Sequence, residues 1–276
     1  MAPLPHSILL LIPAYNEERR LGPVLRAYAR HFRADYAGPF RLVVVLNGCV
    51  DRTEDVVRAA AAEYPEISWL NFPGRIGKGG ALIEGLKLWP EADVIGYVDA
   101  DGATAPPAFH DLVRQIDGVD CAIGSRWLPE SILHVEQSAH RRFFSRAFHL
   151  LVEILFHLGI KDTQCGAKLI RRDAMERVHG ALAIADMAFD INQLYALKQA
   201  GFRIREVPTE WTDQIGSKVN LSRASLAWFL SVVRLRLVYS PFYRWLEPLR
   251  PVELWLYRKL GSPAPLAAPT RPRRVP

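Results

Sequence analysis

Short apolar runs alternate with longer amphipathic segments along the first half of the chain. The runs are rich in Val, Ile and Leu and are typical of buried strands; they cover residues 7–13, 41–46, 67–71, 93–98 and 121–124. Between them, apolar positions recur with a helical period at residues 17–32, 53–64, 78–89 and 106–116. Thr53 is expected to cap the second of these helices. The alternation predicts an α/β fold, with a doubly wound, mostly parallel sheet flanked by helices.

The second half of the chain has a different pattern. Between residues 139 and 158, polar positions such as Arg146 and His149 recur every three or four residues opposite an apolar face, which predicts a strongly amphipathic helix. Three shorter elements are expected after it, a strand at 168–170, a helix at 189–200 and a strand at 203–207. Residues 261–276 are rich in Pro, Ala and Arg and are predicted to be a disordered tail.

Composition limits the class of protein. The 276 residues are 50% hydrophobic and 23% charged, which is enough apolar material for one or two cores and excludes a disordered chain. The three cysteines form no CxxC pair, so we expect neither a disulfide framework nor a zinc site, and a reducing compartment is favoured. No stretch has the pattern of a signal peptide or a transmembrane span.

Positive charge is concentrated toward the C-terminal end. From Lys218 onward there are eleven Lys or Arg residues and two acidic residues, whereas the preceding chain is slightly acidic. Aromatic residues share this segment, a mixture expected on anionic lipid headgroups rather than on nucleic acid. We therefore expect residues 218–260 to form peripheral, membrane-surface helices on the cytoplasmic face of a membrane. A solvated surface, or one packed on the body of the protein, is the alternative.

Two carboxylates follow the strand predicted at residues 93–98. Asp99 and Asp101 form a hard-oxygen pair suited to Mg²⁺ or Mn²⁺ that bridges phosphates. Alone, the pattern also fits an Asp-rich turn. Polar segments after the first two strands, at residues 13–18 and 47–51, favour the metal site, because the carboxyl ends of parallel strands meet at one edge of a sheet. Together these segments predict a nucleotide pocket.

A glycine-rich segment at residues 77–80 lies between the third predicted strand and its helix. Small residues at a helix start expose backbone amides, and Lys78 adds positive charge, which suits a diphosphate. The segment does not have the spacing of a Walker A loop. The alternative is that these glycines only permit close helix packing.

The chain resembles a known family through several motifs in a fixed order. Five segments resemble the inverting nucleotide-sugar glycosyltransferases of family two: LIPAYNEERRL, VVLNGCVDRT, GKGGAL, VDADGAT and GSR. Three later segments are similar to the polyprenyl-phosphate hexosyltransferases, in particular the dolichyl-phosphate glucosyltransferase branch: DTQCGAKLIRRDA, AFDINQLYA and EWTDQIGSKV. The resemblance implies a GT-A fold over residues 1–217. It also implies metal-dependent transfer of a hexose from a nucleotide sugar to a polyprenyl or dolichyl monophosphate.

The resemblance assigns residues to the donor. They are Pro13, Tyr15, Glu17 and Asn47 for the nucleoside, Lys78 for the diphosphate, and Asp99 with Asp101 for the phosphates and the metal. Relatives often have a carboxylate at position 47, but an amide still offers a donor and an acceptor to the edge of uracil. Asp190 matches a carboxylate near the family's reacting centre, with a helix N-cap as the alternative. The floor under the sugar is expected to include Asp162, Gln164 and Cys165, the last as a packed thiol.

The acceptor chemistry favours cationic residues. A phosphate monoester has a second pKa near ~6, so it is already ionised at neutral pH and needs no strong base. Arg126, in the GSR motif, is the first candidate to bind the acceptor phosphate. Arg141 and Ser145 stand one helical turn apart and can face one phosphate. Arg146 and Lys218 complete the set, and a solvated or headgroup-contacting face is the alternative.

The choice of sugar rests on few residues. Asp213, before the GSK motif, and the Asp-Ala-Asp-Gly-Ala-Thr segment resemble the glucose branch and favour UDP-glucose, with GDP-mannose and UDP-N-acetylhexosamine as alternatives. Competing functions are a glycosyltransferase with a soluble acceptor, a nucleotidyltransferase and a non-catalytic membrane-surface binder. The Gly-rich first loop of a nucleotidyltransferase is absent, since residues 13–16 occupy its place. The intact acidic pair and Lys78 argue against a non-catalytic binder.

Overall fold

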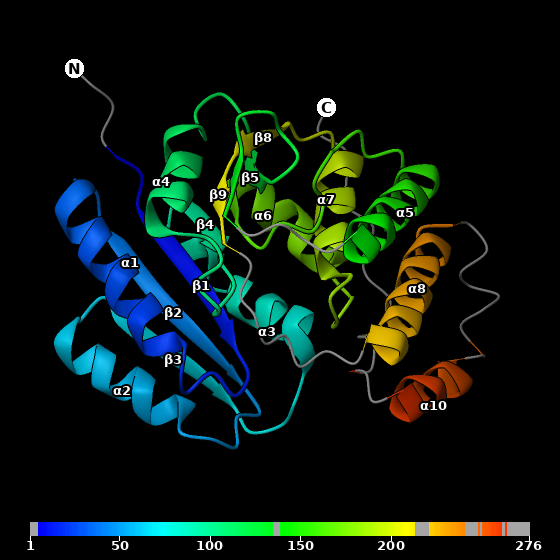
Figure 1. The fold of residues 1–276 in the computed structure, drawn as a ribbon, viewed down its shortest axis with the longest axis horizontal. Coiled ribbons are helices and arrows are strands. Elements are labelled where there is room, and N and C mark those ends of the chain that lie inside the picture. Colours follow the sequence, from blue (N-terminus) through cyan, green and yellow to red (C-terminus); the bar gives the residue numbers. More distant parts are fainter. Residues whose placement is uncertain are drawn as a thin grey trace.

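A seven-stranded sheet forms the centre of the protein (Figure 1). The computed structural model describes residues 5–134, 139–212, 221–240, 248, 250–260 and 263, without the side chains of 139–144, 221–228, 253, 258 and 260. The strands are β1 (Ile8–Ala14), β2 (Phe40–Asn47), β3 (Ile67–Phe72), β4 (Val94–Tyr97), β5 (Cys121–Ser125), β7 (Lys168–Arg171) and β8 (Ile204–Pro208). Their order is β3-β2-β1-β4-β7-β5-β8, and only β7 runs antiparallel to its neighbours in this sheet.

Helices cover both faces of the sheet because the strands alternate their side chains between two cores. Leu10 and Ile12 of β1 pack with the first group of helices, whereas Leu9 and Leu11 pack with the second. The first group is α1 (Leu21–Asp35), α2 (Thr53–Glu63) and α4 (Pro106–Arg114). The second is α3 (Gly77–Leu86), α6 (Arg172–Val178) and α7 (Phe189–Ala200). This is the two-faced α/β architecture predicted from the sequence.

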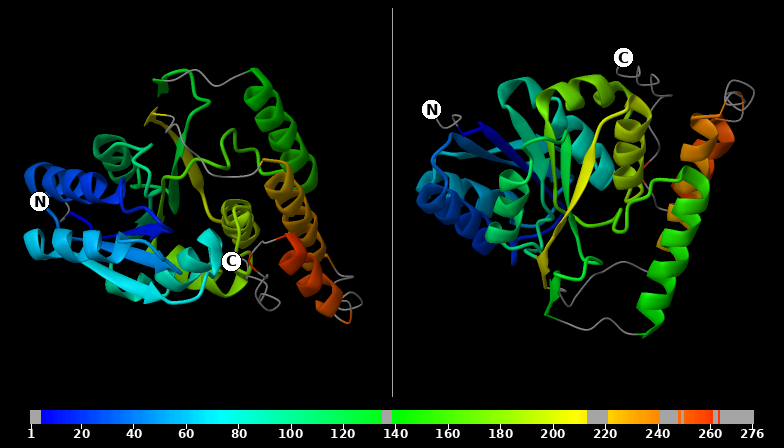
Figure 2. Two further views of the ribbon diagram at one scale, coloured as in Figure 1. Left: turned by 60° about the horizontal axis from the view of Figure 1, so that its bottom comes forward. Right: turned by 90° about the horizontal axis from the view of Figure 1, so that it is seen from above.

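Three further helices form an outer layer beyond α7 (Figure 2). They are α5 (Ala139–Phe156), α8 (Leu221–Val238) and α10 (Arg250–Leu260). Aromatic contacts join this layer to α7: the ring of Tyr195 lies 4.9 Å from that of Phe156 and 4.7 Å from that of Tyr239, between centroids. In the part of the chain that the structure describes, no helix combines the length and the apolar character needed to span a bilayer.

Several local expectations were wrong. Helix α1 begins at Leu21 rather than at residue 17. Thr53 is the first residue of α2 rather than its N-cap, which is Arg52, and its hydroxyl instead accepts the Glu17 N–H at 2.7 Å. Helix α6 and the small parallel sheet of β6 (Ile132–Leu133) and β9 (Glu210–Trp211) were not anticipated. Two-residue strands carry too little periodicity to be recognised in a sequence.

Candidate active site

The carboxyl ends of β2, β1 and β4 lie side by side at one edge of the sheet. This edge receives Asn47 from the end of β2 and the segment containing Tyr15 after β1. Asp99 and Asp101 follow β4 at the same edge. The convergence of polar strand ends expected from the sequence is therefore present, and it results from β1 pairing in parallel with both neighbours.

Lys78 and Asp99 form an ion pair at this edge. The Nζ atom of Lys78, in the first turn of α3, lies 2.6 Å from Oδ1 of Asp99. Burial opposes the charge on Lys78, but Asp99 and Asp190 outweigh it and raise the pKa of the lysine. A Cβ atom on Gly166 would lie 2.2 Å from Oδ2 of Asp99, so only glycine lets this loop approach the carboxylate. Asp99 is thus enclosed on two sides, and its side chain is still 36% exposed.

The Asp99 and Asp101 carboxylates are suited to a divalent cation. Burial, and then the negative charge of Asp99, raise the pKa of Asp101, and a bound cation would favour its charged form. Mg²⁺ and Mn²⁺ accept one or two protein carboxylates, with phosphate oxygens and waters as the remaining ligands. Among the described residues, no group of three or more His, Cys, Asp or Glu side chains could hold a metal. The donor set therefore fits a metal that shares its ligands with a phosphorylated substrate.

Asp190 lies near Lys78 in a buried network of hydrogen bonds and ion pairs. Its Oδ1 atom accepts hydrogen bonds from Lys168 Nζ at 2.5 Å and from the Tyr97 hydroxyl at 2.6 Å. Its Oδ2 atom lies 4.0 Å from Lys78 Nζ. Burial would raise the pKa of Asp190, but the charges of Lys168 and Lys78 outweigh it and lower the pKa. Asp190 is the second residue of α7 rather than its N-cap, which is Ala188.

Arg126 forms a second buried ion pair. Its Nε and Nη2 atoms donate to the two oxygens of Asp162 at 2.7 and 2.9 Å, and its backbone N–H donates to the same carboxylate. Burial would raise the pKa of Asp162, but the hydrogen bonds and charge of Arg126 lower it. The fork engages one edge of the guanidinium and leaves Nη1 directed elsewhere. Arg126 is therefore held in place before any phosphate arrives.

Trp211 links Arg126 to the acidic edge. The Arg126 guanidinium lies over the Trp211 ring, 5.1 Å from its centroid. Trp211 forms an isolated bridge with Thr104, and the Thr212 N–H donates to the Ala103 carbonyl at 3.0 Å. The segment after β8 thus lies against the loop that carries the acidic pair. Burial opposes the charge on Arg126, but the hydrogen bonds and charge of Asp162 outweigh it and raise the pKa of the arginine, with a smaller contribution from Asp99.

The other predicted acceptor residues are only partly placed. Helix α5 reaches the loop after β5, where the rings of Trp127 and His149 lie 4.9 Å apart between centroids. Ser145 is half-buried and Arg146 exposed on this helix. The side chain of Arg141 and the whole of Lys218 lie outside the described residues, as do Asp213 and, apart from Pro263, the tail at 261–276.

The predicted nucleoside residues meet at the β1 and β2 ends. The Arg75 guanidinium stacks on the exposed ring of Tyr15 at 4.6 Å. Glu17 forms a bidentate pair with Arg20, at 2.6 and 2.7 Å. Asn47 is buried, and its Oδ1 accepts the Ile76 N–H at 2.7 Å. The Asn47 amide therefore already supports the glycine-rich segment, while Pro13 lies half-buried at the end of β1.

The glycines at residues 77–80 pack closely against the 184–186 backbone. A Cβ on Gly77, whose φ is +82°, would lie 2.2 Å from the Ala185 carbonyl oxygen, and one on Gly79 would lie 2.3 Å from that of Ile184. The Gly80 N–H donates to the Ala185 carbonyl at 3.1 Å. Close packing therefore explains Gly77 and Gly79, and Lys78 places a charged group on the acidic pair.

Sequence reasoning missed residues that support the site from behind. Lys168 and Tyr97 lie in strands among apolar neighbours, and although Lys168 falls inside the DTQCGAKLIRRDA segment, no role was assigned to it. Gly166 and Trp211 lie inside the DTQCG and EWTDQIGSKV segments, so the resemblance was the available signal for both. Cys165 is fully buried, and burial raises the pKa of its thiol to about 11, which agrees with a packed, unreactive side chain.

Comparison with known families shows to which family this chain belongs. The model of the family "Glycosyl transferase family 2" matches residues 9–178, well over half of the chain. The chain belongs to glycosyltransferase family 2. A dolichyl-phosphate beta-glucosyltransferase (ALG5A) of Trichomonas vaginalis is 33% identical over 223 residues, which span 77% of this chain and 68% of the relative. The dolichyl-phosphate beta-glucosyltransferase of Homo sapiens is 32% identical over 227 residues, 77% of this chain and 69% of the relative.

Solved structures show the same fold. Glucosyl-3-phosphoglycerate synthase from Mycobacterium tuberculosis, in complex with Mn²⁺, UDP and phosphoglyceric acid, superimposes with a TM-score of 0.63 at 18% identity. The match covers 84% of this chain and 78% of that structure. The GT-A fold expected from the sequence is confirmed, and this family 2 member is a glycosyltransferase.

Proposed function

We propose that this glycosyltransferase moves a hexose from a nucleotide sugar, with UDP-glucose favoured, to the phosphate of a polyprenyl or dolichyl lipid. The names of the curated relatives support this acceptor class and glucose as the sugar. One arrangement carries the proposal: Asp99, paired with Lys78, begins the loop whose Thr104 bridges to Trp211, and the Arg126 guanidinium lies over the Trp211 ring. Groups for the donor phosphates and for an anionic acceptor therefore share one site.

The donor phosphates and a divalent metal would bind at the acidic pair. Asp99 and Asp101 would hold Mg²⁺ or Mn²⁺, as suggested by the solved relative in complex with Mn²⁺ and UDP. When bound, the metal would neutralise charge on the departing diphosphate. Lys78 now neutralises Asp99, and a diphosphate would offer its ammonium group a second anionic partner. Tyr15 and Arg75 present a flat, cationic stack at the end of the site assigned to the base.

The acceptor supplies its own nucleophile. An oxygen of the lipid phosphate would form a bond to the anomeric carbon as that carbon's bond to the diphosphate breaks, and the bonding electrons would leave with the diphosphate. Inversion follows from this single displacement. Because the phosphate is already ionised, the site needs cations rather than a base. Arg126 would bind the acceptor phosphate, and the enclosed Asp190 would position Lys78 instead of accepting a proton.

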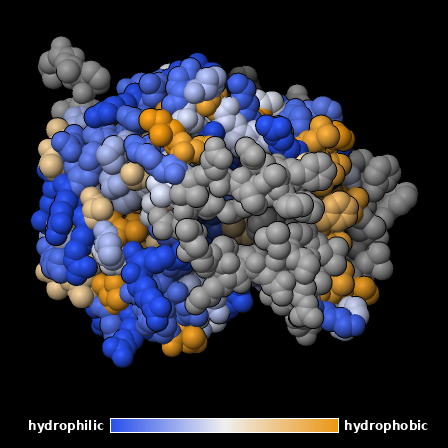
Figure 3. Space-filling view, in the orientation of Figure 1, coloured by the Kyte–Doolittle hydropathy of each residue, from blue (hydrophilic) through white to orange (hydrophobic). Residues whose placement is uncertain are grey.

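The outer helices offer a surface for the lipid. In Figure 3, apolar side chains gather over the side of the molecule formed by α5, α8 and α10. Leu150 and Ile154, one turn apart on α5, are 59% and 60% exposed. Other large apolar side chains are exposed on α8 and α10: Phe229, Leu237, Val252 and Trp255. Such a surface suits contact with a bilayer from which a long-chain acceptor arrives.

One assay tests the proposal. Labelled UDP-glucose, GDP-mannose and UDP-N-acetylglucosamine are offered separately with polyprenyl phosphate, with and without EDTA, and the organic phase is counted. We expect label from UDP-glucose only, and its loss with EDTA. Asp101→Ala is the matched inactive variant. Label that stays in the aqueous phase on a soluble acceptor would contradict the lipid acceptor, and label from another donor would correct the sugar.

A further inference from the structure

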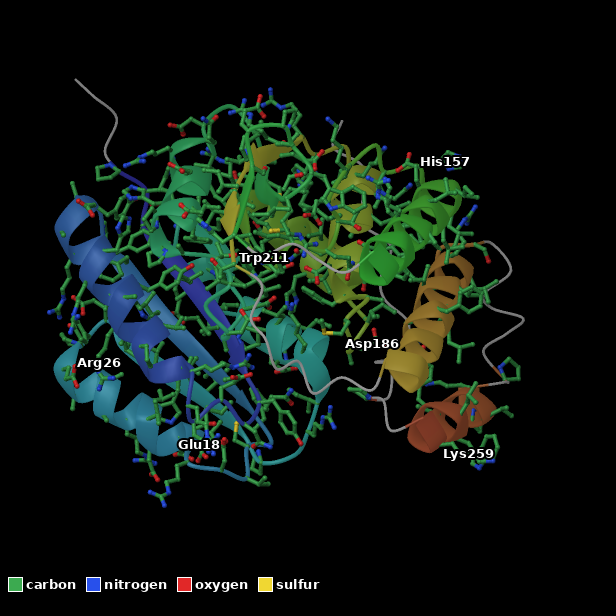
Figure 4. The ribbon with its side chains drawn as sticks, viewed as in Figure 1. Glu18, Arg26, His157, Asp186, Trp211 and Lys259 are labelled. Carbon is green, nitrogen blue, oxygen red and sulfur yellow. The ribbon has the colours of Figure 1, made fainter. Side chains whose placement is uncertain are left out.

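The loop before α7 contacts two regions that are far apart in the sequence. On one side, the backbone of residues 184–186 supports the glycines of α3, through contacts in which Ala185 accepts the Gly80 N–H. The carbonyl of Asp186 belongs to this surface, since it would lie 2.7 Å from a Cβ on Gly79. On its other side, the loop faces α8, and Figure 4 shows Asp186 next to that helix. This short stretch therefore contacts the glycines of α3 through its backbone and the outer layer through the side chain of Asp186.

The Asp186 carboxylate joins α8 and α10 to this loop. Its side chain is buried, and its Oδ2 atom accepts a short hydrogen bond from the Ser231 hydroxyl of α8. The hydroxyl oxygens of Ser231 and Tyr257 lie 2.7 Å apart, so Tyr257 of α10 can donate to Ser231 while Ser231 donates to Asp186. The Oδ1 atom accepts the Ala188 N–H at 2.9 Å. The Asp186 carboxylate is thus bonded directly to α8 and to its own loop, and through Ser231 to α10.

The energetics favour a specific role for this carboxylate. Burial raises the pKa of Asp186, whereas the Ser231 hydroxyl, the Ala188 N–H and the charge of Arg234 oppose that shift. Hydrogen bonds to a buried anion are stronger than neutral ones, and their loss leaves the charge uncompensated. An apolar residue would pack these helices without that cost, so packing alone does not require an acid here.

A second contact joins the same two regions. Pro263 follows α10 and lies against the start of α3, where a Cβ on Gly77 would be 2.4 Å from its Cγ atom. The first turn of α3 is therefore supported by the 184–186 backbone and by Pro263. Lys78 stands in this turn, and its ammonium group must reach Asp99 within 2.6 Å.

We propose that Asp186 is a positioning residue for the donor site, and that α8 and α10 act through it to hold Lys78 in place. The outer helices are then part of the machinery that binds the sugar nucleotide, even when no lipid is present. The proposal rests on the proposed function, in which Lys78 binds the donor diphosphate. The competing view is that α8 and α10 serve the lipid alone.

The test uses variants that remove one hydroxyl each. Ser231→Ala and Tyr257→Phe break the hydrogen-bond chain without touching the donor site, and Ser231→Thr retains the hydroxyl. Lys259→Gln, on the exposed side of α10, is the matched control. UDP binding is measured by calorimetry with Mn²⁺ and without lipid. We expect Ser231→Ala to weaken UDP binding about tenfold, as for the loss of a hydrogen bond to a charged group. Tyr257→Phe loses a bond between two neutral hydroxyls and should weaken it by less, about fivefold, whereas Ser231→Thr and Lys259→Gln should leave it unchanged.

Hydrogen exchange separates this proposal from the choice of donor. The Gly80 amide, bonded to Ala185, should exchange faster in Ser231→Ala and Tyr257→Phe than in the wild type or Lys259→Gln, whatever nucleotide the site takes. If wild-type protein fails to bind UDP, the proposed donor is wrong. Hydrogen exchange at the Gly80 amide then still tests whether α8 and α10 are coupled to the start of α3. Unchanged exchange in both variants overturns the proposal. Unchanged UDP affinity, with activity lost only toward the lipid acceptor, overturns it as well.

Discussion

Two buried ion pairs flank the acidic pair, and they differ in how completely they are enclosed. Lys168 has no exposed side-chain surface, and its ammonium group is used by Asp190 and by the Cys165 carbonyl. Arg126 keeps 17% of its side chain exposed, although Asp162 binds one edge of its guanidinium in a fork. Both carboxylates are 2% exposed, so the difference lies in the cations.

This difference in exposure indicates which cation stabilises the site and which one can contact a substrate. A buried lysine cannot reach a substrate, but it can neutralise Asp190. Lys78 is then available to pair with Asp99. An arginine held on one edge can present its other edge to a phosphate without first losing side-chain freedom. We therefore expect the buried Lys168–Asp190 pair to support the site and the partly exposed Arg126–Asp162 pair to contact the substrate. The predictions below test this assignment on the two pairs and on Tyr97, which donates to Asp190.

Lys168→Met gives the largest expected effect. It removes the cation and leaves the Asp190 carboxylate buried without its main partner, which costs about 3–5 kcal/mol of unfolding free energy. Urea unfolding followed by circular dichroism measures the loss. The double variant Lys168→Met/Asp190→Leu should recover much of the stability, because it removes both charges. A single variant within about 1 kcal/mol of the wild type would show that the pair is not a framework element.

Arg126→Lys should act mainly on catalysis. Lysine keeps the charge but loses the planar fork, so it cannot hold Asp162 and an acceptor phosphate in fixed positions together. We expect kcat/KM for the lipid acceptor to fall about 10²- to 10³-fold, the range seen when one donor to a developing or bound anion is removed. UDP affinity should change little. An equal loss in UDP affinity would place Arg126 on the donor instead.

The two pairs also show what the sequence could reveal. Arg126 was found because it directly follows a strand and belongs to a family motif, and ligands bind beyond the carboxyl ends of strands in a parallel sheet. Lys168 was missed because β7 has a strand-like apolar pattern, and nothing local shows that a lysine within it faces Asp190, 22 residues later in the chain. The strands and most helices follow from hydrophobic period alone. The antiparallel placement of β7 and the loop contacts at Gly166 depend on tertiary packing, which one sequence does not encode locally.

Tyr97→Phe should have a moderate effect on the buried Lys168–Asp190 pair. It removes the 2.6 Å hydrogen bond to Asp190 but keeps the ring, over which the Lys168 ammonium lies at 5.5 Å. We expect a loss of about 1–2 kcal/mol of unfolding free energy, since one hydrogen bond to a charged group is lost and the cation remains. The same denaturant series measures it. A loss as large as that of Lys168→Met would mean that the tyrosine, rather than the lysine, compensates Asp190.

Acid titration should show the smallest effect, because nothing changes at neutral pH. The pKa values of Asp190 and Asp162 are both lowered in the folded protein, so each carboxylate binds a proton more readily in the unfolded chain. Their stabilising contribution is complete above the unfolded value of about 3.9 and is lost as the pH falls through the folded pKa. Carbon-13 NMR of labelled aspartates should show both groups titrating below their usual range. A normal pKa at Asp162 alone would mean that Arg126 is free in solution, and the comparison between the two pairs would then concern mobility rather than exposure.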